Sequence, residues 1–221
     1  MRITAQILSV LFHPLLMLTY MLLLLLLVNP YLFGVNNLGD MKSMKLVIGV
    51  FATSFLLPGF AIFLMWRLQL ISSLEMRDKQ DRIIPFIAAG IFYLWIFRSV
   101  IEDANMPTAF IISVLGTTMG LFICFLINLK FKISLHAVGM GGLVGMVLIM
   151  MWLYSYGSFG LKLPFLGPAE ISMTLLLMVS IVIAGVIGTV RLFLKAHTPV
   201  EVYAGFAVGV LCQFIALKIL V

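Results

Sequence analysis

The chain has 221 residues, of which 63% are hydrophobic and only 10% carry a charge. With a mean hydropathy of +1.22 it has too little polar surface to be a soluble globular protein, so we predict an integral membrane protein with one domain, residues 1–221. The net charge of +6 does not indicate nucleic acid, because the basic residues lie in short loops beside apolar runs, where membrane lipid headgroups are the expected partner.

Seven apolar runs are long enough to cross a bilayer, which takes about 20 helical residues. They cover residues 5–28, 44–66, 84–101, 107–129, 134–156, 169–190 and 199–219. The first run is too long for the core of a signal peptide, and no small-residue cleavage site follows it, so we expect it to be retained. Cys124 and Cys212 lie within such runs and are expected to be buried thiols. The fold class predicted is all-α, a polytopic helical bundle.

Seven crossings divide the loops between the two sides of the membrane. Three polar segments, 67–85, 130–134 and 191–198, fall on the side of the N-terminus. Segments 29–43, 102–106 and 157–168 fall on the other side with the C-terminus. The sequence therefore predicts that the three polar segments meet at one membrane face.

Basic residues are unevenly divided between these two sides, and such a bias orients a membrane protein. Nine lie on the side of the three polar segments: Arg2, Arg67, Arg77, Lys79, Arg82, Lys130, Lys132, Arg191 and Lys195. Four lie on the other: Lys42, Lys45, Lys162 and Lys218. Without Lys79, Arg82 and Arg191, which we assign below to phosphate binding, the count is six basic residues against four. The count leans toward a cytoplasmic position for the polar face and leaves the side open.

Polar residues elsewhere in the apolar runs have simpler interpretations. His13, beside Pro14 in the first run, is expected to hydrogen-bond within the bundle. Arg98 and Glu102 are four residues apart at the end of the third run, a spacing that favours an ion pair. Glycines near residues 139–145 and 205–209 indicate close helix packing.

The first polar segment ends in Arg82-Ile83-Ile84-Pro85, with Pro85 suited to the first turn of a helix. Mixed charges in such a loop are usually solvated, and we keep that interpretation for most of them. Arg82 differs because it lies nearest the membrane edge, where its guanidinium can bind a phosphate. Lys79, one helical turn earlier, is a second candidate.

The second polar segment leads into Ser134-Leu135-His136, where Ser134 is predicted to be an N-cap. A lone histidine at such a place is commonly a hydrogen-bonded interfacial residue. His136 also lies on the same side as His197, and a pair of histidines permits one to attack phosphorus while the other protonates the leaving oxygen.

The third polar segment places Arg191 six residues before His197, at the mouth of the last apolar run. Thr198, Pro199 and Glu201 form a capping-box pattern, so a cap is a sufficient role for Glu201. The same pattern places His197 outside a helix N-terminus, where anions are favoured and Arg191 can bind the same anion. A nucleophilic histidine needs a carboxylate on its other ring nitrogen, and Glu201 is the nearest acidic residue.

These residues resemble the type 2 phosphatidic acid phosphatase superfamily, membrane phosphatases related in fold to vanadium haloperoxidases. Its third motif is Ser-Arg, five residues, His, three residues and Asp, and this chain keeps the spacing with Val190, Arg191, His197 and Glu201. The second motif, Pro-Ser-Gly-His, remains as Ser134-Leu135-His136, without its Pro and Gly. Of the first motif, Lys, six residues, Arg-Pro, only an arginine followed by Pro85 remains. The resemblance covers about residues 82–209.

The resemblance implies a metal-independent lipid phosphatase with no cofactor. His197 would be the nucleophile that forms a phosphohistidine, Glu201 its orienting carboxylate and His136 the acid. The phosphoryl oxygens would be held by Arg82, Arg191, Ser134 and Lys79. We expect a phosphomonoester or diphosphate of a lipid as substrate, in a bacterial cytoplasmic membrane. The alternative is a non-catalytic relative that binds or transports a phosphorylated lipid. The sequence leaves the oligomeric state open.

Overall fold

The computed structural model describes residues 2–74, 76, 80–163 and 167–221. Within these ranges, seven helical segments are long and apolar enough to cross a membrane, so the chain is an integral membrane protein with an all-α polytopic bundle, as predicted. Short turns subdivide some of them. The helices are α1 (Arg2–Leu11), α2 (Met17–Val28), α3 (Met41–Phe51), α4 (Leu57–Arg67), α5 (Ile83–Glu102), α6 (Thr108–Asn128), α7 (Leu135–Leu153), α8 (Met173–Phe193) and α9 (Pro199–Leu220).

The first span is broken between α1 and α2 at His13-Pro14. His13 has an extended backbone (φ −63°, ψ 139°), the conformation to which a following proline restricts its neighbour. A short helical turn, η1 (Pro14–Leu16), then leads into α2. The second span joins α3 to α4 through a π-helical turn, η3 (Ala52–Leu56), and η4 (Gln80–Arg82) precedes α5.

A β-hairpin replaces the start of one predicted span, and the span before it ends early. We predicted that residues 169–172 would begin a helix, and this was wrong. They belong to β2 (Gly167–Ser172), which pairs antiparallel with β1 (Ser158–Leu163). The helix before the hairpin ends at Leu153, three residues earlier than predicted. Gly157, with φ +87°, turns the chain into β1, and Ser158 Oγ donates to Glu170 Oε1 at 2.5 Å.

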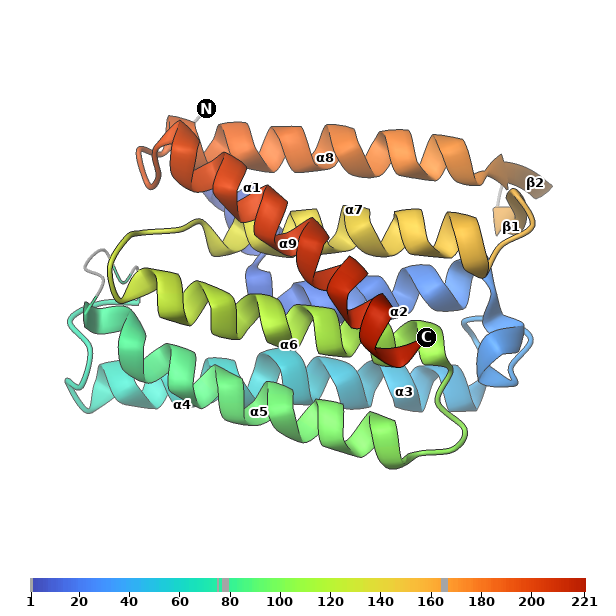
Figure 1. Cartoon of the computed structure of the whole chain (residues 1–221), viewed down its shortest axis with the longest axis horizontal. Coiled ribbons are helices and arrows are strands. Elements are labelled where there is room, and N and C mark those ends of the chain that lie inside the picture. Colours follow the sequence, from blue (N-terminus) through green and yellow to red (C-terminus); the bar gives the residue numbers. More distant parts are fainter. Residues whose placement is uncertain (1, 75, 77–79, 164–166) are drawn as a thin grey trace.

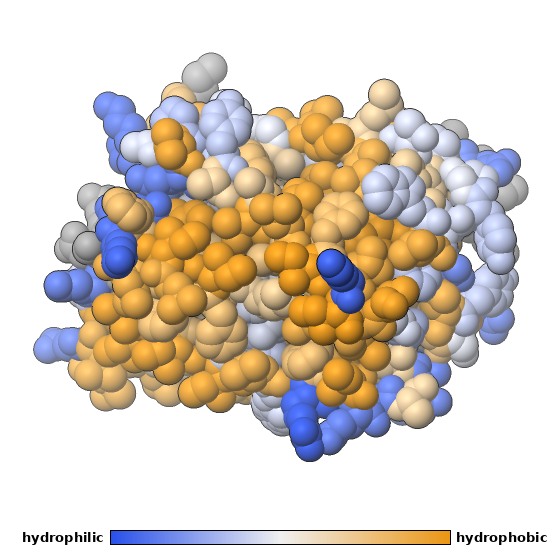
Figure 2. Space-filling view, in the orientation of Figure 1, coloured by the Kyte–Doolittle hydropathy of each residue, from blue (hydrophilic) through white to orange (hydrophobic). Residues whose placement is uncertain are grey.

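The N-terminus lies at the same end of the bundle as the connections α4–α5, α6–α7 and α8–α9, at the left of Figure 1. The hairpin and the connections α2–α3 and α5–α6 lie at the opposite end. Figure 2 shows a largely hydrophobic surface between these ends, with hydrophilic residues gathered mainly at the ends and along one edge. The three polar segments therefore share one end of the bundle, as predicted.

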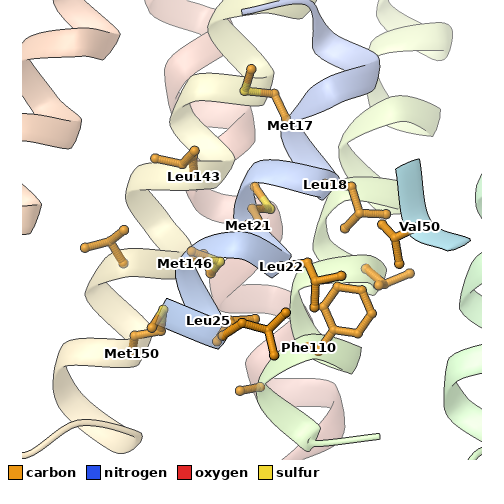
Figure 3. Packing of buried hydrophobic residues seen from close by; sticks show 14 of the residues in the cluster. Met17, Leu18, Met21, Leu22, Leu25, Val50, Phe110, Leu143, Met146 and Met150 are labelled. Atoms are coloured by element: carbon orange, nitrogen blue, oxygen red, sulfur yellow. The ribbon is translucent and has the colours of Figure 1, made fainter. Parts of the chain in front are cut away.

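The main apolar core surrounds α2, whose side chains pack between α7 and α6 (Figure 3). Met17, Leu18 and Met21 are fully buried there. Helices α7 and α9 approach closely through glycines. A Cβ at Gly209 would lie 2.1 Å from the carbonyl oxygen of Val138, and one at Gly141 would lie 2.3 Å from that of Phe206. This contact confirms the packing interpretation of these glycines.

Two smaller predictions are also confirmed. Arg98 and Glu102 form an ion pair at 2.5 Å with both side chains largely exposed. Cys124 and Cys212 are buried free thiols.

Candidate active site

A cavity of about 880 Å³ opens at the end of the bundle that carries the three polar segments. Its lining includes all three histidines of the chain and five basic residues. These residues are His13, His136, His197, Arg2, Arg82, Lys132, Arg191 and Lys195. No Asp or Glu occurs among the described residues that line it. The composition of the wall favours an anionic ligand.

The turn between α8 and α9 directs His197 back toward Arg191. Lys195 adopts a left-handed conformation (φ 52°), and the Ala196 N–H donates to the carbonyl oxygen of Arg191 at 3.1 Å. This reversal closes the end of α8 in the usual manner of a helix C-terminus. Helix α9 then starts at once, because Thr198 Oγ1 accepts from the Glu201 N–H at 3.4 Å. The predicted N-cap is confirmed.

Glu201 has a second partner besides its own helix. Its Oε2 lies 2.6 Å from Nδ1 of His197, whose side chain is only 4% exposed. A carboxylate at Nδ1 favours the tautomer with the proton there, which leaves the lone pair on Nε2. The pair thus has the geometry of an oriented nucleophile.

The electrostatic surroundings of His197 favour its neutral form. Burial lowers the pKa of His197 below its ordinary value, and the nearby cations Arg191 and Arg82 lower it further, while the bond to Glu201 opposes the shift. Glu201 also interacts electrostatically with the Arg82 guanidinium. His197 is therefore close in space to basic residues from two other spans.

His136 enters the cavity from the first turn of α7. The main chain ties this turn to α9, because the Ser134 N–H donates to the carbonyl oxygen of Glu201 at 3.3 Å. Nε2 of His136 lies 2.9 Å from the carbonyl oxygen of Ser9 and 3.2 Å from its hydroxyl. The structure thus brings His136 and His197 to one cavity.

Ser134 is placed differently from the other predicted phosphate ligands. Its side chain is fully buried, and its hydroxyl accepts from the Ala137 N–H at 3.4 Å as the N-cap of α7. It is not among the residues that line the cavity. Its hydroxyl holds the helix that carries His136, and the contact with phosphate that we predicted for it is not prepared in this arrangement.

The two arginines reach the cavity from α8 and from the start of α5. Arg82 is oriented by the loop before it, since its Nε donates to the carbonyl oxygen of Met76 at 2.8 Å. Nη1 of Arg191 donates to Ser9 Oγ at 2.6 Å, while its buried Nε has no hydrogen-bond partner among the described residues. A buried guanidinium N–H without an acceptor is costly, and a bound anion or water is one way to satisfy it. The remaining candidate, Lys79, lies outside the described residues.

The first span contributes residues that we did not predict from the motifs. Ser9 contacts both Arg191 and His136, and His13 lies with its ring centroid 5.8 Å from that of His136. The hydrogen bond that we expected His13 to make into the bundle is local instead, because its Nδ1 accepts from the Leu15 N–H. Arg2, Gln6, Ser9 and His13 recur at helical spacing in the sequence, and this polar stripe was the available signal.

The cavity also extends inward from the polar end, between apolar helices. It passes Phe86, Ala89 and Leu121 and reaches Gly142 and Gln213. Gln213 lies 14 residues after the start of α9, which corresponds to about 21 Å along the helix axis. The cavity thus extends from a cationic mouth to membrane depth.

Comparison with known proteins does not add to these observations. No protein-family model matches the chain, and neither a curated protein nor a solved structure matches it. Membership of the type 2 phosphatidic acid phosphatase superfamily accordingly stays a prediction based on motif spacing.

Proposed function

We propose that the protein is a membrane phosphatase that hydrolyses a lipid phosphomonoester or diphosphate through a phosphohistidine intermediate. The observation that carries this proposal is the His197–Glu201 pair on a cavity that is lined by cations and, among its described residues, by no carboxylate. A nucleophile, an orienting carboxylate and anion-binding groups together fit phosphoryl transfer better than binding alone.

In the first step, the lone pair on Nε2 of His197 forms a bond to phosphorus as the bond from phosphorus to the leaving oxygen breaks. Glu201 stabilises the positive charge that develops on the imidazole. Arg82 and Arg191 bind the phosphoryl oxygens, whose negative charge offsets the two guanidinium charges and so favours protonation of His136. Protonated His136 transfers its proton to the leaving oxygen, and the lipid departs as an alcohol or, from a diphosphate, as a monophosphate.

In the second step, water attacks the phosphohistidine. Neutral His136 takes a proton from the water while the water oxygen bonds to phosphorus. The bond between phosphorus and Nε2 of His197 breaks. Inorganic phosphate and neutral His197 result, and His136 again carries the proton it donated. The two histidines therefore complete the cycle without a net change in the enzyme.

The shape of the cavity supports a lipid as the substrate. Its polar mouth lies at one end of the bundle, whereas Phe86, Ala89 and Leu121 line the part that leads into the membrane interior. An amphiphile places its phosphate in the first region and apolar chain in the second, where burial of each CH₂ contributes about 0.8 kcal/mol. A water-soluble phosphate ester gains only the first set of contacts.

A phosphate-release screen tests the proposal. The detergent-solubilised protein, with a chelator present, is expected to release phosphate from at least one of phosphatidic acid, phosphatidylglycerol phosphate and polyprenyl diphosphate. Long-chain substrates should react with a higher kcat/KM than short-chain analogues of the same headgroup. Arg98→Ala is the matched control, since this arginine pairs with Glu102 at the far end of the bundle. Absence of release from every lipid in the panel would reject a phosphatase.

The pH dependence should reflect the environment of His197. Because the pKa of His197 is lowered, its imidazole stays neutral at pH values below the ordinary histidine pKa of about 6.5. The value of kcat/KM is therefore expected to fall only at more acidic pH. In Glu201→Gln the influence that raises this pKa is lost, so the acidic limb should move to lower pH while the plateau falls at least about tenfold. Profiles of kcat/KM against pH for both proteins measure this. An acidic limb that Glu201→Gln leaves in place would contradict the assigned pair.

A further inference from the structure

Helix α1 forms a wall of the cavity that the motifs do not include. Arg2, Gln6, Ser9 and His13 all line the cavity. The spacings of four and three residues place Arg2, Gln6 and Ser9 on one side of α1, and His13 lies two residues beyond its end. Ala5 and Ser9, one turn apart, are the buried residues of α1, which packs against α8. The span is thus fixed to the helix that carries Arg191.

Ser9 contacts two of the groups assigned to the phosphoryl oxygens and the leaving group. Its hydroxyl accepts from Nη1 of Arg191 at 2.6 Å and lies 3.2 Å from Nε2 of His136. Its carbonyl oxygen lies 2.9 Å from the same Nε2. Ser9 itself is buried, at 9% exposure. One residue of α1 therefore bridges α7 and α8 at the polar end of the cavity.

These contacts define a hydrogen on His136. A carbonyl oxygen only accepts, so Nε2 of His136 must carry a proton to make the 2.9 Å contact. The hydroxyl of Ser9 accepts from the Arg191 guanidinium, because a guanidinium group has only hydrogen-bond donors. Both N–H groups thus converge on the oxygens of Ser9, and a phosphoryl oxygen that binds beside Ser9 can take over as their acceptor.

We propose that Ser9 is a positioning residue of the site, which holds the guanidinium of Arg191 and the Nε2–H of His136 for a bound phosphoryl group. This inference rests on the proposed function for its catalytic consequence, although the binding of phosphate alone also tests it. The break at His13-Pro14 supports the role, because it lets α1 take a direction set by its contact with α8 rather than by α2.

The test compares Ser9→Ala with Ser9→Thr in the full-length protein. Loss of a hydrogen bond to a charged group corresponds to about a tenfold change in affinity. Ser9→Ala is therefore expected to raise KM about tenfold, with a smaller change in kcat, and to weaken the binding of inorganic phosphate by a similar factor in calorimetry. Ser9→Thr, which keeps a hydroxyl, should restore both values to within about threefold of the wild type.

Ser180→Ala is the matched control, because Ser180 is a buried serine on α8 whose hydroxyl donates to the carbonyl oxygen of Leu176 in its own helix. It should leave KM and phosphate affinity unchanged. Unchanged or tighter phosphate binding by folded Ser9→Ala would overturn the proposal. If the wild type binds phosphate but hydrolyses no lipid, the proposed function fails, while the comparison of phosphate affinities still decides the role of Ser9.

Discussion

Substitution of His197 by alanine is expected to abolish phosphate release, with a loss in kcat of at least about a thousandfold, because a covalent mechanism has no substitute for its nucleophile. The ring that is removed bonds Glu201 at 2.6 Å and lines the cavity beside Arg191. Steady-state release from the preferred lipid measures the loss. Acid quenching of the wild type with substrate labelled in the phosphoryl group should also capture label on the protein, and the variant should retain none.

Thr198→Ala separates this role from the structural one. Thr198 caps α9, and loss of such a cap costs about 1 kcal/mol of stability. If His197 and Glu201 served only the helix start, Thr198→Ala and His197→Ala would reduce activity to a similar, small extent. We expect Thr198→Ala to unfold more readily and to keep most of its activity. Labelled protein or sustained turnover in His197→Ala would show that the nucleophile lies elsewhere.

Much of the architecture follows from hydropathy alone. Apolar runs of the length of a bilayer predicted the seven spans, and the parity of the crossings placed the three polar segments at one end of the bundle. Short motifs with strong local chemistry were also recognisable. Thr198 and Ser134 are the N-caps that their positions before helices indicated. The length of an apolar run and the residue before a helix are properties of the local sequence, so the spans and the N-caps could be predicted from it.

The features that sequence analysis missed depend on contacts between distant segments. The hairpin at 158–172 is short, and its second strand runs directly into α8, so hydropathy joined its last residues to the following apolar run. The role of Ser9 arises from neighbours 127 and 182 residues away. A serine in an apolar helix is ordinarily explained by a bond to its own backbone, and only the packing of α1 on α8 distinguishes this one.

The alternative of a non-catalytic lipid-binding protein makes different use of the same cavity. The degraded first motif favours it, and the cationic wall serves binding as well as catalysis. Binding alone does not require the carboxylate of Glu201 at Nδ1 of His197, and this contact reduces the positive character of the wall near the histidine. A hydrogen-bonded imidazole and carboxylate beside two arginines is better suited to chemistry at phosphorus. The two functions predict different results for His136→Ala. A phosphatase loses turnover, whereas a binding protein has no turnover to lose.

Substitution of His136 by alanine is expected to lower kcat for an alkyl phosphate lipid by about 10²- to 10⁴-fold, the usual contribution of a general acid. An aryl ester such as p-nitrophenyl phosphate has a leaving group that needs little protonation, so its first step should lose much less. Because His136 also acts in the second step, which both substrates share, the quantity to compare is kcat/KM, which reports the first step alone. Comparison of kcat/KM for the two substrates in the same variant therefore isolates proton transfer to the leaving group from damage to the cavity. The fold should survive, because α7 is held by its N-cap Ser134 and by glycine contacts with α9.

The difference between the losses on alkyl and aryl esters also distinguishes the role of His136 from that of Ser9. Ser9→Ala disturbs Arg191 as well as His136, so it should raise KM for both substrates and lower kcat/KM for both by a similar factor. A binding protein would show no turnover to lose. An equal loss of kcat/KM on alkyl and aryl esters would assign His136 to phosphate binding, and the leaving oxygen would then have to take its proton from another group. The leaving-group dependence of His136→Ala is thus the measurement that decides whether the pair of histidines divides attack and protonation between them.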